Sequence, residues 1–288
     1  MNRLTLAVLS VFIPLSTAVA QTTEQLPQPS FPHRWQLNLQ TPASPVMEKM
    51  VDFHNLLLWI CTLISVFVLG LLIYVAVKFN SRANPVPSKT THNTLLEVIW
   101  TGIPVLILAA IAIPSYRLLF FADRIENPEM TLKITGNQWY WSYEYPDTEI
   151  SFDSLALPDD KIDVSKGQHR MLEVDNELYI PIDTSVRLLF TATDVIHAWT
   201  IPAFGVKNDA MPGRTNESWV RATKIGKFYG QCSELCGVDH SFMPIVVNVV
   251  SKDQYKAWVA SKKQSASAEP ATKAASAEPT TQLASAQN

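Results

Sequence analysis

The stretch Cys232-Ser233-Glu234-Leu235-Cys236-Gly237-Val238-Asp239-His240-Ser241-Phe242-Met243 places two thiols, an imidazole and a thioether in one short segment. Soft thiolate and thioether ligands select copper over harder cations, and a weak methionine ligand is typical of copper sites that transfer electrons. A zinc site would gain nothing from Met243, because zinc takes thiolate, imidazole and carboxylate ligands. The segment therefore predicts a copper site.

A second histidine, His197, lies 35 residues upstream, directly after a strand-like run. A mononuclear blue-copper site uses one cysteine, so two cysteines and two histidines favour two coppers that share the thiolates. Two other sites remain open on spacing alone. Cys232 and Cys236 could form a short-loop disulfide in an oxidising compartment. A zinc site from His197, Cys232, Cys236 and His240 has suitable ligands, although it lacks the usual paired spacings.

The amino terminus has the three regions of a secretory signal peptide over residues 1–20. Met1-Asn2-Arg3 supplies the charge, residues 4–15 are apolar, and Ala18-Val19-Ala20 supplies the small residues before the cleavage site. We therefore expect the mature chain to begin outside the cytoplasm, where thiols can be oxidised or bind metal, with an N-terminal periplasmic segment over residues 21–55.

Two apolar runs, residues 56–77 and 98–121, are each near the roughly 20 residues that cross a hydrocarbon core as a helix. They predict a transmembrane hairpin over residues 56–121. The connecting loop carries Lys78, Arg82 and Lys89 and no acid before Glu97, which places it in the cytoplasm. The prediction is thus a multi-pass protein of a bacterial inner membrane, with both termini and the following domain in the periplasm.

Residues 122–260 predict an all-β domain. Short strand-like segments such as Val186 to Thr193 and Ile245 to Val250 are separated by turn residues, which is typical of an antiparallel Greek-key sandwich or barrel. Beyond Trp258 the sequence loses its apolar periodicity and repeats Ser-Ala-Glu-Pro, so residues 261–288 predict a disordered tail.

The pattern His197 … Cys232-x-Glu234-x-Cys236-x-x-x-His240-x-x-Met243 resembles the copper A site of cytochrome c oxidase subunit II, in the haem-copper oxidase family. The resemblance implies a cupredoxin fold in which both cysteines bridge two coppers and each histidine caps one. It also implies that Met243 is a weak ligand and that the Glu234 carbonyl completes the shell. The Glu234 side chain would help to bind magnesium shared with subunit I, and oxygen ligands suit that ion.

The same resemblance implies the function. The chain would accept electrons from reduced cytochrome c and pass them to haem a in subunit I, where oxygen is reduced to water with proton pumping at haem a and copper B. It would be a subunit of an oxidoreductase and translocase whose oxygen site lies elsewhere, with subunit III as a further partner and no nucleic acid. The chain has no Cys-x-x-Cys-His motif for a covalent haem, so the electron donor is a separate protein.

The aromatic run Gln138-Trp139-Tyr140-Trp141 resembles the stretch in which subunit II places a surface tryptophan that receives the electron. That residue would be Trp139, flanked by Gln138 and Tyr140 at the docking face. Alternation alone is equally typical of a sandwich strand with one buried aromatic face.

Glu97 stands in Leu96-Glu97-Val98-Ile99-Trp100, which resembles the segment that places a glutamate at the mouth of the proton channel of subunit I. An ionisable side chain at this membrane edge is either functional or snorkels to the headgroups.

Between Asp123 and Asp194 the chain has 15 acidic and 6 basic residues, although its overall charge is only −3. An acidic surface attracts a basic partner such as cytochrome c, while solubility alone also explains it. Asp175 and Asp194 match the docking positions of the family best. The full set of candidates for docking is Glu144, Asp147, Asp153, Asp159, Asp175 and Asp194.

Three other functions compete with this assignment. A quinol oxidase subunit of the same architecture lacks the copper ligands, all of which are present here. A copper-delivery or storage protein has little use for two membrane spans and an aromatic run. Nitrous oxide reductase shares the copper pattern, but it resembles only the cupredoxin part of this chain.

Overall fold

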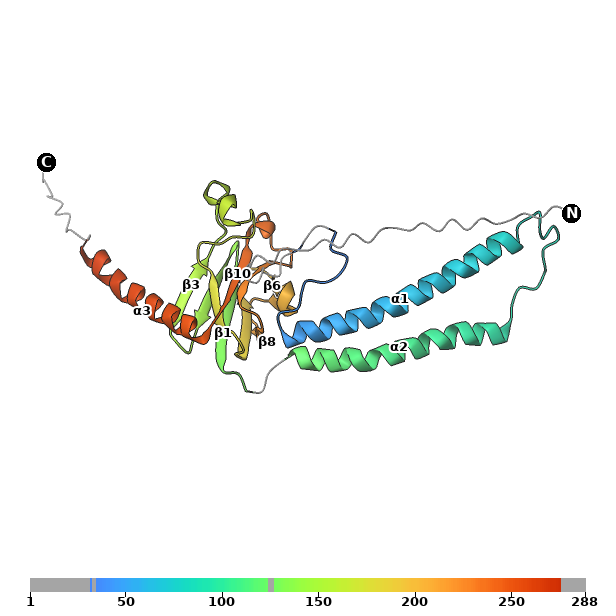
Figure 1. The fold of residues 1–288 in the computed structure, drawn as a ribbon, viewed down its shortest axis with the longest axis horizontal. Helices are drawn as coiled ribbons and strands as arrows, with labels where there is room; N and C mark the ends of the chain where they lie inside the picture. The colour runs from blue at the N-terminus through green and yellow to red at the C-terminus, as the bar shows by residue number, and fades with distance from the viewer. Residues whose placement is uncertain (1–31, 33–34, 124–126, 276–288) are drawn as a thin grey trace, which may run out of the picture.

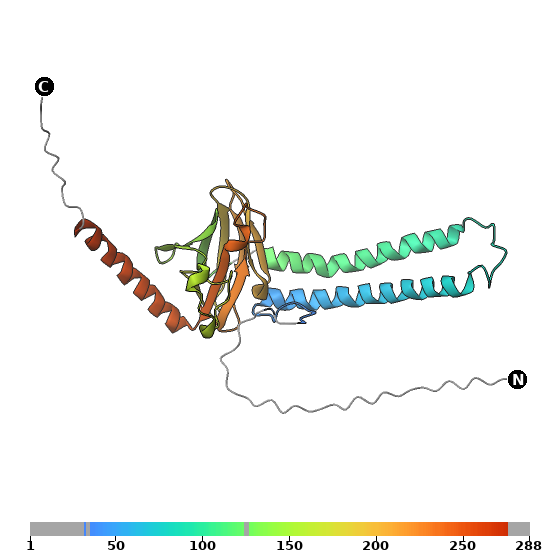
Figure 2. The ribbon, with the colours of Figure 1, turned by 90° about the horizontal axis from the view of Figure 1, so that it is seen from above.

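The computed structural model describes residues 32, 35–123 and 127–275, so the predicted signal peptide lies outside the described residues. Two long helices project side by side from one face of a β-sandwich, and a third helix projects from the opposite side (Figure 1). The view from above shows the same separation into a helical hairpin, a sandwich and a third helix (Figure 2).

The helical hairpin consists of α1 (Pro45–Lys78) and α2 (Thr94–Asp123). Both are long and apolar enough to cross a membrane, by length and composition. They are longer than the predicted spans because an apolar run marks only the hydrocarbon core, whereas a helix can continue through the headgroups. Helix α1 begins at a regular cap: the Ser44 side chain accepts a hydrogen bond from the Met47 amide, and Pro45 occupies the first turn.

The sandwich is built from ten strands. A five-stranded sheet has the order β3-β2-β1-β5-β8, a three-stranded sheet has the order β4-β10-β9, and β6 pairs with β7. The strands are β1 (Met130–Asn137), β2 (Tyr140–Tyr145), β3 (Ile150–Ser154), β4 (Leu178–Pro181), β5 (Val186–Ala192), β6 (His197–Ile201), β7 (Val206–Ala210), β8 (Asn216–Val220), β9 (Gly226–Gln231) and β10 (Pro244–Val250). Single 3-10 turns are η1 (Asp159–Lys161), η2 (Val164–Lys166), η3 (Pro202–Phe204) and η4 (His240–Phe242).

The core lies between the sheets, and the strand sequences explain it. Every second residue of β1 and of β5 is buried, as a strand with one inward face requires. Leu132 and Phe190 come from the five-stranded sheet and Ile245 from the three-stranded sheet, and all three are inaccessible to solvent. The sandwich prediction is confirmed, but β1 pairs in parallel with β5 and β10 with β4. The connection from β1 to β5 passes through β2 and β3 of the same sheet and then through β4 of the other sheet.

The hairpin is bonded to the sandwich at both helix ends. At the start of α1, the Ala43 amide donates to Ala203 O at 2.9 Å, and the Ser44 hydroxyl donates to Phe204 O at 2.6 Å. At the end of α2, the Trp219 indole donates to Phe121 O at 2.9 Å. These bonds hold the helix ends against β8 and η3.

The third helix, α3 (Lys252–Ala275), packs its first turns on the sandwich through aromatic rings. Trp258 stacks on Tyr179 with ring centroids 5.1 Å apart and lies 5.2 Å from Tyr145. The helix continues to Ala275, so the expected disorder from residue 261 is wrong for residues 261–275; residues 276–288 lie outside the described part. Alanine and lysine between residues 261 and 275 favour a helix, whereas Pro270 opposes it, so local propensity does not account for the full length of α3.

We expect Gly230→Ala to lower the free energy of unfolding by about 3 kcal/mol or more. An added Cβ would lie 1.8 Å from Thr200 O, because β9 passes directly over β6. Denaturation of the full chain in detergent, followed by tryptophan fluorescence, measures the loss. Gly167→Asn is the control, since Gly167 has open space and a left-handed φ of 74° that asparagine tolerates. Equal losses in the two variants would contradict the proposed clash.

Candidate metal centre

The two thiols face each other at the end of the sandwich where β9 ends. Cys232 and Cys236 are both buried and free, and their sulfur atoms lie 3.8 Å apart. The segment between them turns back on itself, and the Ser233 amide donates to Ala198 O of β6 at 3.0 Å. The thiols are therefore held against the strand that carries His197.

Each sulfur has a histidine ring nitrogen beside it. His197 begins β6, is inaccessible to solvent, and places Nδ1 3.9 Å from the Cys232 sulfur. His240 begins η4 and places Nδ1 3.5 Å from the Cys236 sulfur. The ligand atoms of His197, Cys232 and Cys236 lie within 4.8 Å of one another. The structure thus brings four predicted ligands together from two distant parts of the chain.

Met243 and Glu234 complete the cluster. Met243 precedes β10, is 1% exposed, and has its thioether sulfur 3.5 Å from the Cys236 sulfur. The Glu234 carbonyl oxygen lies 3.4 Å from the Cys232 sulfur, while the residue itself is exposed. The Met243 sulfur, the two ring nitrogens and the Glu234 carbonyl oxygen thus each lie within 3.9 Å of one of the two buried thiols. Since soft sulfur and imidazole ligands suit copper, this donor set fits copper and gives no role to a hard cation within the cluster.

Asp194 orients His197, a role that the sequence prediction missed because it assigned Asp194 to docking. Its carboxylate lies 2.9 Å from His197 Nε2. The contact favours the tautomer with the proton on Nε2, which leaves the Nδ1 lone pair directed at the thiols. The contact is local, and the spacing of three residues from the histidine was the available signal.

The charges of the metal-free site follow from these contacts. Burial is the largest single effect on Cys232 and opposes its ionisation, but the hydrogen bonds with His197, with the backbone at Glu234 and Ala198, and with His240 together outweigh it and lower the pKa to about 6. Burial and the neighbouring Cys232 sulfur raise the pKa of Cys236 to about 12. Burial lowers the pKa of His197, and the contacts with Cys232 and Asp194 more than offset this effect and raise it. One thiolate is thus present near neutral pH, and the second is suppressed by the first.

The predicted aromatic run contacts the segment from Cys232 to Met243 directly. Gln138 and Trp139 form the turn between β1 and β2, with Gln138 exposed and Trp139 half-buried. The Trp139 indole donates to Cys236 O at 3.2 Å, and the side-chain amide of Gln138 donates to the same oxygen at 2.8 Å. Trp141 is fully buried, and its indole donates to Met243 O. Within this run, Gln138 is thus at the surface, whereas Trp141 belongs to the core.

Gly237 makes this contact possible, and sequence reasoning did not single it out. Its φ of 127° lies in the region that favours glycine, and an added Cβ would be 2.9 Å from the Trp139 ring. The residue after Cys236 is therefore constrained by a neighbour about 100 positions away.

The structure separates the predicted docking acids. Asp194 contacts the aromatic turn directly, because its carboxylate accepts a hydrogen bond from the backbone amide of Gln138 at 2.7 Å. Asp153 and Asp175 neighbour each other around β3 and Leu155. Asp159 is paired with Arg170. Tyr140 begins β2 beside Trp139 and is half-buried.

Glu144 and Asp147 lie at the other end of the β1–β2 hairpin. Glu144 is paired with Lys133, and Asp147 accepts a hydrogen bond from the Thr131 amide. Five residues of strand separate Glu144 from Trp139, or about 16 Å. The structure therefore does not bring these two acids together with the aromatic turn.

Glu97 lies in the first turn of α2, at the end of the hairpin remote from the sandwich (Figure 1). Its carboxylate accepts a hydrogen bond from the Asn93 amide at 3.3 Å, while the Asn93 side chain accepts one from the Leu96 amide. This is the reciprocal arrangement of a helix cap. Glu97 thus has a structural role that the sequence reading did not consider.

Residues 130–250 match the family model described as cytochrome C oxidase subunit II, periplasmic domain, and residues 32–118 match its transmembrane domain. The probable cytochrome c oxidase subunit 2 of Rickettsia bellii (strain RML369-C) is 52% identical over 239 residues, which are 83% of this chain and 88% of the relative. The cytochrome c oxidase subunit 2 of Phytophthora megasperma is 46% identical over 234 residues, 79% of this chain and 91% of the relative.

Among solved structures, the chain is similar to the periplasmic domain of subunit II of cytochrome oxidase from Bradyrhizobium japonicum. The identity is 50%, the match covers 49% of this chain and 99% of that one, and the TM-score is 0.46.

We expect the apparent affinity for copper to rise about tenfold for each pH unit between pH 7 and pH 9. In this range Cys232, with a pKa of about 6, is already ionised, whereas Cys236, with a pKa of about 12, must lose its proton to bind metal. Titration of the reduced full chain against a chelator of known copper affinity gives the slope. An affinity independent of pH would contradict the participation of the Cys236 thiolate.

Proposed function

The chain belongs to the cytochrome c oxidase subunit II family, and we propose that it accepts electrons from cytochrome c at a binuclear copper A centre for transfer to haem a of subunit I. Its two apolar helices are the transmembrane part of a haem-copper oxidase subunit, and its cupredoxin-like sandwich is the periplasmic domain. Oxygen reduction and proton pumping would occur in subunit I, with subunit III as a further partner. Both termini would then be periplasmic.

The observation that carries the proposal is the arrangement of donors around the paired thiols of Cys232 and Cys236, with His197 beside the first sulfur and His240 and Met243 beside the second. The thiolates would hold two coppers between them, with one histidine at each end and the thioether and the Glu234 carbonyl as weaker ligands. When bound, such a copper pair supplies a one-electron acceptor and donor. The surrounding residues keep water out and hold the ligands in place, because Cys236 and Met243 are almost fully buried.

Trp139 is the residue that we propose takes up the electron from the donor. It is half-exposed at the tip of the β1–β2 turn, and its indole is bonded to the backbone of Cys236. Gln138 shares the same acceptor oxygen and keeps the turn in contact with the metal segment. A donor that docks over this turn would be one hydrogen bond away from the metal ligands.

We place the docking face around the aromatic turn, with Asp194, Asp153 and Asp175 as its acids and Tyr140 at its edge. The acids would attract the basic surface of cytochrome c and increase the rate of encounter. Asp159 is partly neutralised by Arg170. Glu144 and Asp147 would contribute only to the longer-range field.

Two further roles concern subunit I. The exposed carboxylate of Glu234 would supply one oxygen ligand to a magnesium ion between the subunits, and the remaining ligands would come from subunit I. Glu97 would lie at the mouth of the proton channel on the cytoplasmic side. Its hydrogen bond with Asn93 would then have to open for a proton to pass.

A zinc site and a disulfide are the two alternatives that the same residues could form. A zinc site would leave the buried thioether of Met243 without a role. A disulfide would leave His197 and His240 beside a neutral sulfur pair.

The decisive experiment is copper analysis and electron paramagnetic resonance of the full chain in detergent, loaded with copper after reduction. We expect two coppers per chain and one unpaired electron shared over both nuclei. One copper, zinc in preference to copper, or a Cys232 to Cys236 disulfide that resists metal would overturn the proposal.

Met243→Leu provides the matched variant for this measurement. The thioether is a weak ligand, so we expect copper to be retained while its spectrum and potential shift. Complete loss of copper would mean that Met243 is a principal ligand.

We expect Trp139→Ala to slow electron uptake from cytochrome c in the assembled oxidase by at least about tenfold, or ~1.4 kcal/mol of barrier. Stopped-flow oxidation of cytochrome c measures the rate, and the copper spectrum reports on the intact centre. Trp35→Ala is the control, because Trp35 is a 94% exposed tryptophan of the N-terminal segment. A normal rate in Trp139→Ala would exclude this residue as the site of electron uptake.

A further inference from the structure

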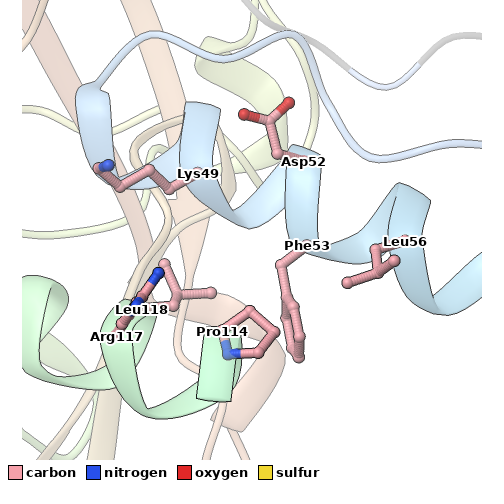
Figure 3. Close-up of a pocket in the computed structure, with 7 residues that line it drawn as sticks. All are labelled: Lys49, Asp52, Phe53, Leu56, Pro114, Arg117 and Leu118. Atoms are coloured by element: carbon pink, nitrogen blue, oxygen red, sulfur yellow. The ribbon is translucent and has the colours of Figure 1, made fainter. Parts of the chain in front are cut away.

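A hollow lies between the first turns of α1 and the last turns of α2, next to the sandwich (Figure 3). Its walls combine two cationic side chains, Lys49 and Arg117, with apolar ones. In Figure 3, Phe53 points from α1 toward Pro114 of α2, and Leu56 and Leu118 continue the apolar wall. None of these residues belongs to the metal centre, which lies on the sandwich.

Neither cation has an acidic partner among the described residues. Lys49 lies over the Phe121 ring, with its ammonium nitrogen 4.8 Å from the ring centroid, and Arg117 is exposed. The carboxylate of Asp52 also borders the hollow, but Figure 3 shows it on the side of α1 that faces away from α2. Two positive charges thus stand at one end of an apolar groove.

The position of the groove indicates what fills it. The end of the hairpin that adjoins the periplasmic sandwich lies at the level of the outer lipid headgroups, since the bonds to Ala203, Phe204 and Trp219 hold both helix ends there. Basic residues at this face run against the usual distribution of Lys and Arg in membrane proteins. At headgroup depth, charges of this kind attract anionic lipid.

We propose that this groove binds one anionic glycerophospholipid. Its phosphate lies between Lys49 and Arg117, and an acyl chain covers Phe53, Leu56 and Leu118. Pro114 lacks a backbone N–H donor, and its apolar ring faces the proposed acyl chain. The lipid would fill the space between two helices that otherwise contact each other sparsely and would brace the periplasmic end of the hairpin against the sandwich.

The test is native mass spectrometry of the full chain in detergent, titrated with dioleoylphosphatidylglycerol. We expect one tightly retained lipid, with the apparent Kd raised about fivefold in Lys49→Gln and in Arg117→Gln. Arg82→Gln is the matched control, because it removes one charge at the opposite end of the hairpin. Lys49→Arg keeps the charge and should retain the lipid.

Four results would overturn the proposal. The first is that Lys49→Gln and Arg117→Gln retain the lipid as well as the unmodified chain does, and the second is that Arg82→Gln loses as much lipid as they do. The third is that dioleoylphosphatidylcholine is retained as tightly as the anionic lipid, and the fourth is that inorganic phosphate alone displaces the lipid. The assembled oxidase is tested in the same way. If the chain alone retains the lipid but the variants lose none in the assembled complex, the occupant there is another subunit and the lipid is excluded. Unchanged circular dichroism shows that each variant is folded.

Discussion

The close approach of β9 to β6 is the constraint on which the metal centre depends. Gly230 passes within van der Waals contact of the Thr200 carbonyl, and the Ser233 amide then bonds to Ala198 O. This contact brings the thiols beside His197, although the two parts of the chain belong to different strand pairs. A side chain at position 230 would separate the strands and so separate the ligands.

The aromatic turn depends on the same segment from the other side. The Cys236 carbonyl accepts hydrogen bonds from both Gln138 and Trp139, and Gly237 leaves room for the Trp139 ring. Asp194 connects the buried thiol–histidine cluster to the aromatic turn, because its carboxylate contacts both the His197 ring and the backbone amide of Gln138. The aromatic turn and the buried thiols with His197 are therefore parts of one hydrogen-bonded unit, so that a change at the turn reaches the thiols through a few short bonds.

The membrane end of the domain is organised by a different set of contacts. The Ala43 backbone amide, the Ser44 hydroxyl and the Trp219 indole donate the hydrogen bonds that hold the ends of α1 and α2. Since these bonds orient the sandwich on the hairpin, they also set the level of Lys49 and Arg117 at the bilayer surface. The position of the metal centre above the membrane and the lipid groove beneath it thus have a common origin.

The sequence by itself determined the clustering of candidate ligands, the two apolar spans and the strand-rich domain, because each depends on residue chemistry or on a short local period. Cys232, Cys236, His240 and Met243 lie within twelve residues, so local spacing sufficed for them. The contacts of Asp194 with His197 and of Glu97 with Asn93 are local, but a polar pair three or four residues apart has no periodic pattern, so the sequence analysis did not assign them. It also did not indicate that α3 extends to Ala275. Only the tertiary structure decided which acids lie beside Trp139, since strand pairing and the turn between β1 and β2 place residues that are far apart in the chain. Hydrogen bonds and packing between distant segments carry no periodic signal, which is the physical reason for this division.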